Sequence, residues 1–183
     1  MEVKFFLHGT MDEKQINDVS ELNHYLSNPS DPDVDMYDWA DPAYGKFLLL
    51  DEKNVVGKVS IHKTETEYCG QRFYLGGFGG LVVRSEYRNH GYGRILAEEA
   101  IKKLEQIGVD VACMCVDMES GITNFYERLG YRFLNRPAYF ISWEEKEKTD
   151  NTVMILGICN KALAEKILNT HGKFHYGQDR GHW

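Results

Sequence analysis

The spacing of apolar residues along the chain predicts a mixture of helices and strands. Apolar positions recur every three or four residues over 11–26 and 95–107, which is typical of amphipathic helices. Shorter helices are predicted over 120–129 and 161–168. Alternating or continuous apolar runs predict strands over 3–7, 47–50, 55–64, 73–83, 109–116, 131–133, 138–143 and 152–158. The charged residues 144–150 indicate a solvated connection, and 171–183 show no clear element.

Turn and capping signals separate these elements. Thr10, followed by Glu13, predicts a capping box at the start of the first helix. Residues 51–54 and 69–71 have the chemistry of hairpin turns, so the strands on either side of them should form an antiparallel meander. The last strand of this meander contains four glycines: Gly76, Gly77, Gly79 and Gly80. Glycine packs no side chain in a strand, so we expect a bulge there or a close approach of another group to the backbone.

The composition indicates one soluble globular domain. The 183 residues are 43% hydrophobic and 27% charged, which is enough to bury a core without disulfides. With 21 basic and 28 acidic side chains the formal charge is −7. This charge argues against a nucleic-acid partner and favours a cationic small molecule, provided that the acids converge on a cleft. No apolar run approaches the ~20 residues of a membrane helix, so we expect a cytoplasmic protein without a membrane partner.

The cysteines and histidines do not predict a metal site. The four cysteines lack the paired spacing of zinc ligands: Cys69, Cys113, Cys115 and Cys159. Cys113 and Cys115 lie in an apolar run, so both are expected to be buried thiols in a reducing cytosol. His171, His175 and His182 come late in the chain, but neither a nearby cysteine nor a predicted helix accompanies them.

The segment of residues 31–42 is unusually acidic. Its alternating acids suggest a calcium loop, but Met36 stands where that loop needs glycine and Pro42 where it needs glutamate. Two interpretations remain: a solvated loop, or a substrate wall whose carboxylates meet ammonium groups. The carboxylates of that wall would be those of Asp33, Asp35 and Asp38.

The loop of residues 88–94 has the features of an anion-binding site. Gly91 and Gly93 lie between a predicted strand and a predicted helix. Glycines let several backbone N–H groups turn inward, and a helix start adds the positive end of its dipole, so the loop suits a pyrophosphate. It is not a dinucleotide fingerprint, because the third glycine is lacking.

The sequence Arg88-Asn89-His90-Gly91-Tyr92-Gly93 resembles the R/Q-x-x-G-x-G/A motif of the GNAT superfamily, the acetyl-coenzyme A-dependent N-acetyltransferases. The resemblance spans residues 73–133, with Leu81-Val82-Val83 before the motif and residues 125–131 after it. It implies an α/β (α+β) fold, in which helices flank a mixed, mostly antiparallel central sheet with a V-shaped splay between two central strands. It also implies acetyl-coenzyme A (acetyl-CoA) as the co-substrate.

By this resemblance, the family's mechanism assigns roles to particular residues. The backbone of Leu81, Val82 and Val83 would pair with the pantetheine arm, and the Leu81 N–H would polarise the thioester carbonyl. The pyrophosphate would contact Arg88, Asn89, His90, Gly91, Tyr92, Gly93 and Arg94. Glu119 would be a further cofactor contact, at a position where many relatives place Asn. Tyr126 would protonate the departing thiolate, because a phenol pKa of about 10 is matched to a thiol pKa of about 8.5.

A second resemblance, to the aminoglycoside 2′-N-acetyltransferases of that superfamily, points to the acceptor. It rests on a similar length, the acidic residues 33–39, the strand at 78–83, the late strand from 152 and Trp183 as the last residue. The terminal carboxylate of Trp183 would then reach the substrate amine. The strand glutamate that activates the amine in that group falls on Gly79, so the base must come from Trp183, His182 or the acidic segment.

These inferences predict a single acetyltransferase domain over residues 1–183, with an acetyl-CoA-binding core at 73–133 between the parts 1–72 and 134–183. We expect acetyl transfer to a primary amine of a small cationic acceptor, with an aminoglycoside as the leading candidate, by direct attack in a ternary complex. The alternative acceptors are a polyamine, an amino acid and a protein amino terminus. A catalytically weak acetyl-CoA-binding regulator is the other alternative. The oligomeric state is open, with a homodimer as one possibility.

Overall fold

The computed structural model of the chain describes residues 1–23, 43–119, 121–141 and 145–180. These residues form two compact units, each with its own hydrophobic core. The first unit contains residues 1–23, 43–62 and 78–102, and the second contains the other described residues. Two strands, β3 (Asn54–Tyr68) and β4 (Gln71–Val83), run through both units.

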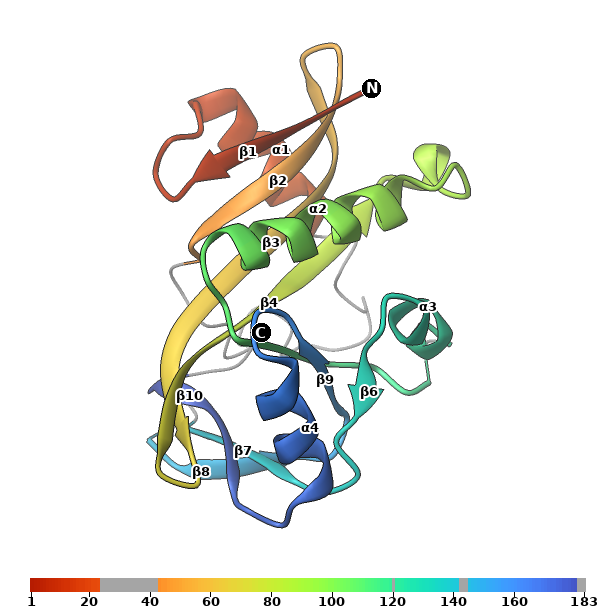
Figure 1. Cartoon of the computed structure of the whole chain (residues 1–183). Coiled ribbons are helices and arrows are strands. Elements are labelled where there is room, and N and C mark those ends of the chain that lie inside the picture. The colour runs from red at the N-terminus through yellow and green to blue at the C-terminus, as the bar shows by residue number, and fades with distance from the viewer. Residues whose placement is uncertain (24–42, 120, 142–144, 181–183) are drawn as a thin grey trace. The chain divides into compact units, whose positions relative to one another are not determined.

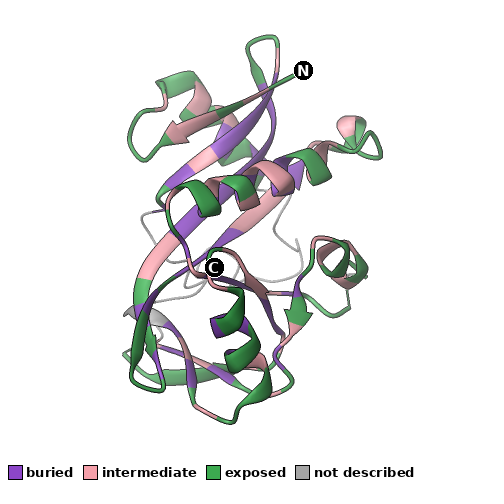
Figure 2. Cartoon of the chain, in the orientation of Figure 1, coloured by how far each residue is buried: buried purple, intermediate pink, exposed green. Residues whose placement is uncertain are grey.

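The first unit is built on antiparallel strands. β1 (Glu2–Leu7) pairs with β2 (Gly45–Asp51), and β2 pairs with β3. The turn at Glu52 and Lys53 has Glu52 at a φ of +54°, so the predicted hairpin is confirmed. Figure 1 shows α1 (Glu13–Asn23) behind these strands, whereas α2 (Tyr92–Gln106) begins beside the end of β4 and then crosses in front of β3. The buried residues of this unit concentrate along β2 and β3 (Figure 2).

The helix α1 packs its apolar side on these strands. Val19 and Leu22 are both buried there. Their partners in the core cluster are Leu48, Leu50, Val55 and Val82. Strand residues distant in sequence thus share one core with α1.

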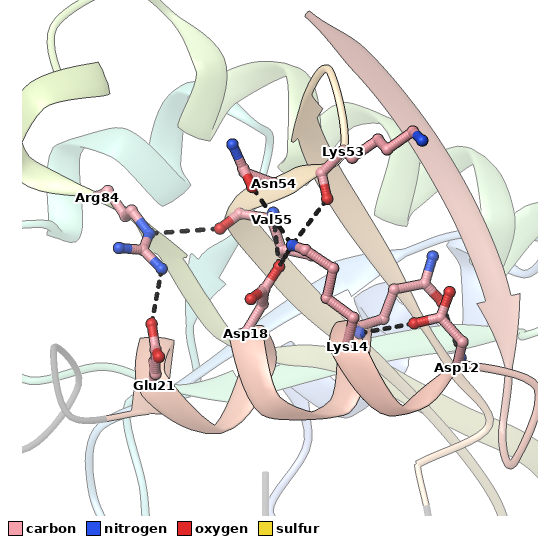
Figure 3. A network of polar contacts seen from close by, with 9 residues as sticks. Asp12, Lys14, Asp18, Glu21, Lys53, Asn54, Val55 and Arg84 are labelled. Atoms are coloured by element: carbon pink, nitrogen blue, oxygen red, sulfur yellow. Dashed lines mark hydrogen bonds and ion pairs between the residues drawn. The ribbon is translucent and has the colours of Figure 1, made fainter.

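A polar network also ties α1 to the turn between β2 and β3 (Figure 3). Lys14 Nζ donates to Asp18 Oδ2 at 2.7 Å and to the Lys53 carbonyl at 3.0 Å. The Val55 N–H donates to Asp18 Oδ2 as well, at 3.2 Å. Although partial burial opposes it, the Lys14 ammonium and the Val55 N–H hold the pKa of Asp18 below its ordinary value.

The second unit places β5 (Val111–Cys115) next to β4, to which it is parallel, and β9 (Val153–Gly157), to which it is antiparallel. β6 (Arg132–Phe133) pairs with the other edge of β9. Hydrogen-bonded neighbours follow the order β1-β2-β3-β4-β5-β9-β6. The helices of this unit are α3 (Thr123–Arg128) and α4 (Lys161–Asn169), and α4 packs Leu163 and Ile167 into the core.

A separate three-stranded sheet contains two strands that the sequence did not indicate. β7 (Ala138–Ile141) pairs antiparallel with β8 (Glu147–Asp150) and parallel with β10 (Phe174–Arg180). The prediction of a solvated connection is therefore wrong for residues 147–150, and the prediction of no element is wrong for residues 174–180. β8 is an edge strand whose exposed charged residues conceal it in the sequence. β10 buries Phe174 and Tyr176 against a partner strand that is remote in the sequence.

The predicted fold class is confirmed, because a mixed and mostly antiparallel sheet is flanked by helices. β4 and β5 pair through Leu75 with Val111 and Gly76 with Ala112, and their pairing stops there among the described residues. The predicted splay would begin at this point, and it stays a prediction, as does the single domain. Within the described part of the chain, no helix is long and apolar enough to cross a bilayer.

The start of α1 differs from the prediction. The helix begins at Glu13, and Thr10 Oγ1 donates to the Leu7 carbonyl at 2.9 Å. Asp12 Oδ1 instead accepts from the Gln15 N–H at 2.8 Å, and Gln15 Oε1 accepts from the Asp12 N–H at 3.0 Å. The reciprocal pair that caps the helix is therefore Asp12 with Gln15, and the predicted pair of Thr10 with Glu13 is wrong.

The substitution Asp12→Ala is expected to lower the free energy of unfolding by about 1 kcal/mol, because an N–H of the first helical turn loses its acceptor. Chemical denaturation followed by circular dichroism measures this change. Glu13→Ala removes the acid of the wrongly predicted pair and should cost clearly less. Equal losses in the two variants would contradict the assignment of Asp12 as the cap.

Candidate active site

The end of β4 offers backbone groups on the edge that faces away from β3. The Arg84 N–H donates to the Val56 carbonyl at 2.8 Å, and the Val82 carbonyl lies 3.0 Å from where a Cβ would be at Gly57. Residues 82 and 84 therefore direct their backbone groups to β3. Because successive residues of a strand point these groups to opposite edges, the N–H and C=O of Leu81 point away from β3.

The polypeptide leaves this strand through a short turn that side chains hold in place. After β4 comes the 3-10 turn η2 (Ser85–Tyr87), and the Tyr87 hydroxyl donates to Asp51 Oδ2 at 2.8 Å. Arg88 Nε donates to the Val83 carbonyl at 2.9 Å, so this predicted pyrophosphate contact also ties the loop back to the strand. The pairing of Tyr87 with Asp51 could not be predicted, because no local pattern in the sequence links residues so far apart.

The loop that follows is shaped by two residues in the left-handed region. Asn89 has a φ of +64° and Gly91 a φ of +81°, and turns of this kind direct neighbouring N–H groups into one concavity. The helix α2 begins at Tyr92, earlier than the predicted residue 95, and its first intrahelical bond runs from the Ile95 N–H to the Gly91 carbonyl. The N–H groups of residues 92–94 therefore have no acceptor within the helix. Together with the helix dipole they favour an anion at this position.

Neither the backbone conformation nor the packing of the described residues requires glycine at position 93. Its φ is outside the left-handed region, and a Cβ built there would meet nothing within 4 Å among the described residues. Alanine would fit and would suit a helix better. A ligand that approaches the backbone closely is a physical reason to keep the residue here small, glycine or the alanine that the motif also allows.

Tyr126 lies on α3 in the second unit and is half-buried. Its ring meets the rings of Phe125 and Tyr131 edge-on, with centroids 5.1 Å and 6.3 Å away. Burial raises the pKa of Tyr126 to about 12. The phenol therefore keeps its proton at physiological pH, and it can act as a hydrogen-bond donor or an acid but not as a base.

The structure describes only some of the other predicted site residues. Glu119 is exposed before α3, and its N–H donates to Asp117 Oδ1 at 2.9 Å. Gly79 lies half-buried in β4, with no side chain to serve as a base. Five predicted residues lie outside the described residues: Asp33, Asp35, Asp38, His182 and Trp183.

The two cysteines of β5 cannot supply a nucleophile in this environment. Burial raises the pKa of the Cys113 thiol and, with the nearby Asp150 carboxylate, that of the Cys115 thiol. Cys115 Sγ also lies 2.6 Å from the Tyr176 hydroxyl. Both thiols stay protonated at neutral pH, which is unfavourable for a covalent acyl-cysteine intermediate. The described residues contain no group of three or more metal-ligating side chains.

The model of the Acetyltransferase (GNAT) family matches residues 14–131, which is more than half of the chain. The chain belongs to this family. As a GNAT acetyltransferase it is an acyl-transferring enzyme whose co-substrate is acetyl-CoA. The likeness to GNAT enzymes is thereby confirmed, whereas the finer likeness to aminoglycoside 2′-N-acetyltransferases stays a prediction. No curated protein sequence matches the chain significantly.

Solved structures of GNAT enzymes share its fold. YhbS from Escherichia coli, in complex with CoA, superposes with a TM-score of 0.62 over 99% of this chain and 89% of that chain, at 17% identity. The ribosomal-protein-S18-alanine N-acetyltransferase from Escherichia coli gives 0.56 over 86% and 94%, at 16% identity. A chain of the NatC complex, bound to Gag peptide and CoA, gives 0.54 over 86% and 99%, at 20% identity. At these identities the likeness concerns the fold alone.

Gly93→Leu is expected to weaken the binding of CoA about ten-fold or more, because a side chain larger than the alanine that the motif also allows enters the space that we assign to the pyrophosphate. The same change should leave the unliganded protein as stable or raise its unfolding free energy by up to about 1 kcal/mol, since leucine is a better helix former than glycine. Calorimetric titration with CoA and thermal melts measure the two effects.

Gly70→Leu is the matched control. Gly70 also has open space around it, but its φ of +78° makes any side chain strained, and it lies in the turn between β3 and β4. That variant should lose stability while it binds CoA normally. A Gly93→Leu variant with normal CoA binding would contradict the placement of the pyrophosphate.

Proposed function

We propose that this GNAT enzyme acetylates the primary amine of a small acceptor by direct attack within a ternary complex. The observation that carries the proposal is the stretch from Leu81 to Arg94, where an outward strand edge leads into an anion-binding helix start. A thioester carbonyl at the Leu81 N–H would be polarised, and a pyrophosphate at residues 91–94 would meet several N–H groups. The protonated state of Cys113 and Cys115 supports direct attack, since neither can carry the acetyl group.

Tyr126 would act on the leaving group. Its phenol stays protonated up to high pH, whereas the thiol of a departing coenzyme has an ordinary pKa of about 8.5. Complete proton transfer to a relaxed thiolate would therefore be unfavourable. A hydrogen bond to the sulfur while negative charge develops is the role that suits this phenol.

The base that neutralises the attacking amine is not provided at Gly79. Our candidates remain the Trp183 α-carboxylate, His182 and the acidic group of residues 33–38, because carboxylates and imidazoles are the groups that most often act as general bases. An amine that arrives uncharged would need no base, so its own pKa would then set the pH dependence of the reaction.

Different observations support different acceptors. The acidic composition and the likeness to aminoglycoside 2′-N-acetyltransferases favour a small cationic acceptor such as an aminoglycoside. A polyamine shares this chemistry. A protein amino terminus is the alternative suggested by the two structural relatives whose names mention a peptide or a ribosomal protein. Cys69, Cys113, Cys115 and Cys159 are thiols that form no disulfide among the described residues, which suits a cytoplasmic location.

An acceptor panel tests this proposal. The protein is incubated with acetyl-CoA and with aminoglycosides, polyamines, amino acids and amino-terminal peptides, and free thiol is followed over time. At least one class should release thiol well above the rate without acceptor, with a product heavier by one acetyl group in mass spectrometry. Binding of CoA without turnover in any class would support a regulator instead.

Tyr126→Phe should reduce kcat about 100-fold with the best acceptor, because a hydrogen-bond donor to charge that develops in the transition state typically contributes at least that factor, while the KM for acetyl-CoA stays nearly constant. In the unmodified enzyme, no loss of rate from ionisation of this phenol is expected below about pH 10, since its pKa is about 12. Steady-state kinetics from pH 6 to pH 10 check both statements. Tyr74→Phe, which removes an exposed hydroxyl on β4, is the control and should be unchanged. Unaltered turnover in Tyr126→Phe would remove Tyr126 from the mechanism.

A further inference from the structure

Four polar side chains share the face of β2 and β3 that is turned toward α1: Lys46, Lys58, Ser60 and His62. Lys58 lies directly opposite Leu48, and Leu48 belongs to the core that α1 covers. Lys46 lies directly opposite Ser60. Opposite residues of an antiparallel pair point to the same face, as do residues two apart in one strand. These four residues, here called the polar cluster, therefore lie together beside the end of α1.

Lys58 is the most buried ammonium group of the polar cluster. The residue is only 4% exposed, and its Nζ donates to Asn23 Oδ1 at the end of α1. Burial and the nearby Lys46 charge lower the pKa of Lys58 to about 8, so it still carries a proton at neutral pH. No ion pair formed within the described residues includes Lys58. A buried ammonium with a neutral partner is destabilising unless an anion offsets it.

Lys46 adds a second positive charge beside it. Its Nζ donates to Ser60 Oγ at 2.9 Å, and its charge acts on both Lys58 and His62. His62 is 6% exposed, and burial, aided by Lys46, lowers its pKa to about 3, so the ring is neutral at pH 7. Lys46 is half-buried and is the lysine of the cluster that water reaches more readily. The polar cluster thus combines two ammonium groups with a hydroxyl and a neutral imidazole.

The carboxylates of α1 in the network of Figure 3 are directed to other cations. Asp18 accepts from Lys14 and from the Val55 N–H. Glu21 Oε2 accepts from Arg84 Nη2 at 3.0 Å. These acids of α1 therefore have cationic partners outside the polar cluster.

We propose that Lys46, Lys58 and Ser60 bind the carboxylate of the acceptor. The acceptor of this enzyme would then be an amino acid or a similar molecule that carries an amine and a carboxylate together. Two ammonium groups and a hydroxyl match the two oxygens of a carboxylate, and such charge-assisted bonds are strong where water is largely excluded. This inference rests on the proposed acetyl transfer, and it selects the amino-acid alternative over aminoglycosides and polyamines, which lack a carboxylate.

A binding measurement tests the subsite without turnover. In protein labelled with 13C-lysine, the 13Cε signal that disappears in Lys58→Met reports the titration of Lys58. L-ornithine should raise the apparent pKa of Lys58 by at least about one unit, because a bound carboxylate favours the charged ammonium. Putrescine, the same diamine without the carboxylate, should leave it unchanged. Inorganic phosphate separates the two sources of an anion: an equal shift with phosphate would overturn the assignment to an acceptor carboxylate.

A kinetic measurement links the subsite to the reaction. The pairs are L-ornithine with putrescine, L-lysine with cadaverine, and L-phenylalanine with phenethylamine. The carboxylate-bearing member of at least one pair should have the higher kcat/KM. Lys58→Met should raise its KM about ten-fold or more with little change in kcat, and should leave the KM of the matched amine unchanged. Methionine has a similar volume and no charge, so this variant is expected to fold, and Lys46→Met provides a second test of the same prediction.

Lys53→Met is the control, because Lys53 is exposed in the turn between β2 and β3 and only its backbone carbonyl takes part in the network of Figure 3. Its kinetics and its Lys58 titration should equal those of the unmodified protein. If both members of each pair respond equally to Lys58→Met, or if L-ornithine leaves the Lys58 titration unchanged, the subsite does not exist. If L-ornithine shifts the titration but no acceptor is acetylated, the subsite stands and the proposed reaction fails.

Discussion

The hydrogen bond from the Arg84 N–H to the Val56 carbonyl decides which backbone groups of β4 are available to a ligand. It aligns the end of β4 with β3, and Gly57 permits the close approach because a side chain there would press on the Val82 carbonyl. Leu81 then directs its N–H and C=O to the other edge. A slip of one residue would turn Leu81 toward β3 and bury the groups that we assign to the thioester. The candidate cofactor site is thus a consequence of strand register.

Burial sets the proton chemistry of the described residues in one consistent direction. It keeps Tyr126, Cys113 and Cys115 protonated and His62 deprotonated, so each holds its neutral form at pH 7. These groups can donate hydrogen bonds or pack, but none of the acids among them can carry negative charge. Lys58 is the exception, because it remains cationic at neutral pH despite its burial. An anion bound beside Lys58 would offset the free-energy cost of burying this charge.

Much of the fold could be predicted because its signals are local. The turn at Glu52 needs only the residues of the turn itself, and helical spacing identifies α2 and α4 wherever they pack. The strand β10 depends instead on β7, a partner more than thirty residues earlier in the sequence, whose presence no window of sequence reveals. The cap of α1 was predicted wrongly because two overlapping pairs, Thr10 with Glu13 and Asp12 with Gln15, both have the chemistry of a capping pair. Only the backbone geometry selected Asp12 over Thr10.

The features of the candidate site likewise divide into those that the local sequence predicts and those that depend on the tertiary structure. The sequence by itself predicted the loop of residues 88–94, its two glycines and Tyr126 as parts of the candidate site, since the spacing from Arg88 to Gly93 and the residue types are recognisable locally. Only the tertiary structure decided that the backbone N–H and C=O of Leu81 point away from β3 and that the polar residues of β3 are buried. In the sequence, alternating polar residues such as Lys58, Ser60 and His62 suggest a face in water. Which face meets water depends on the elements that cover the sheet, and burial is a property of that packing and not of the strand.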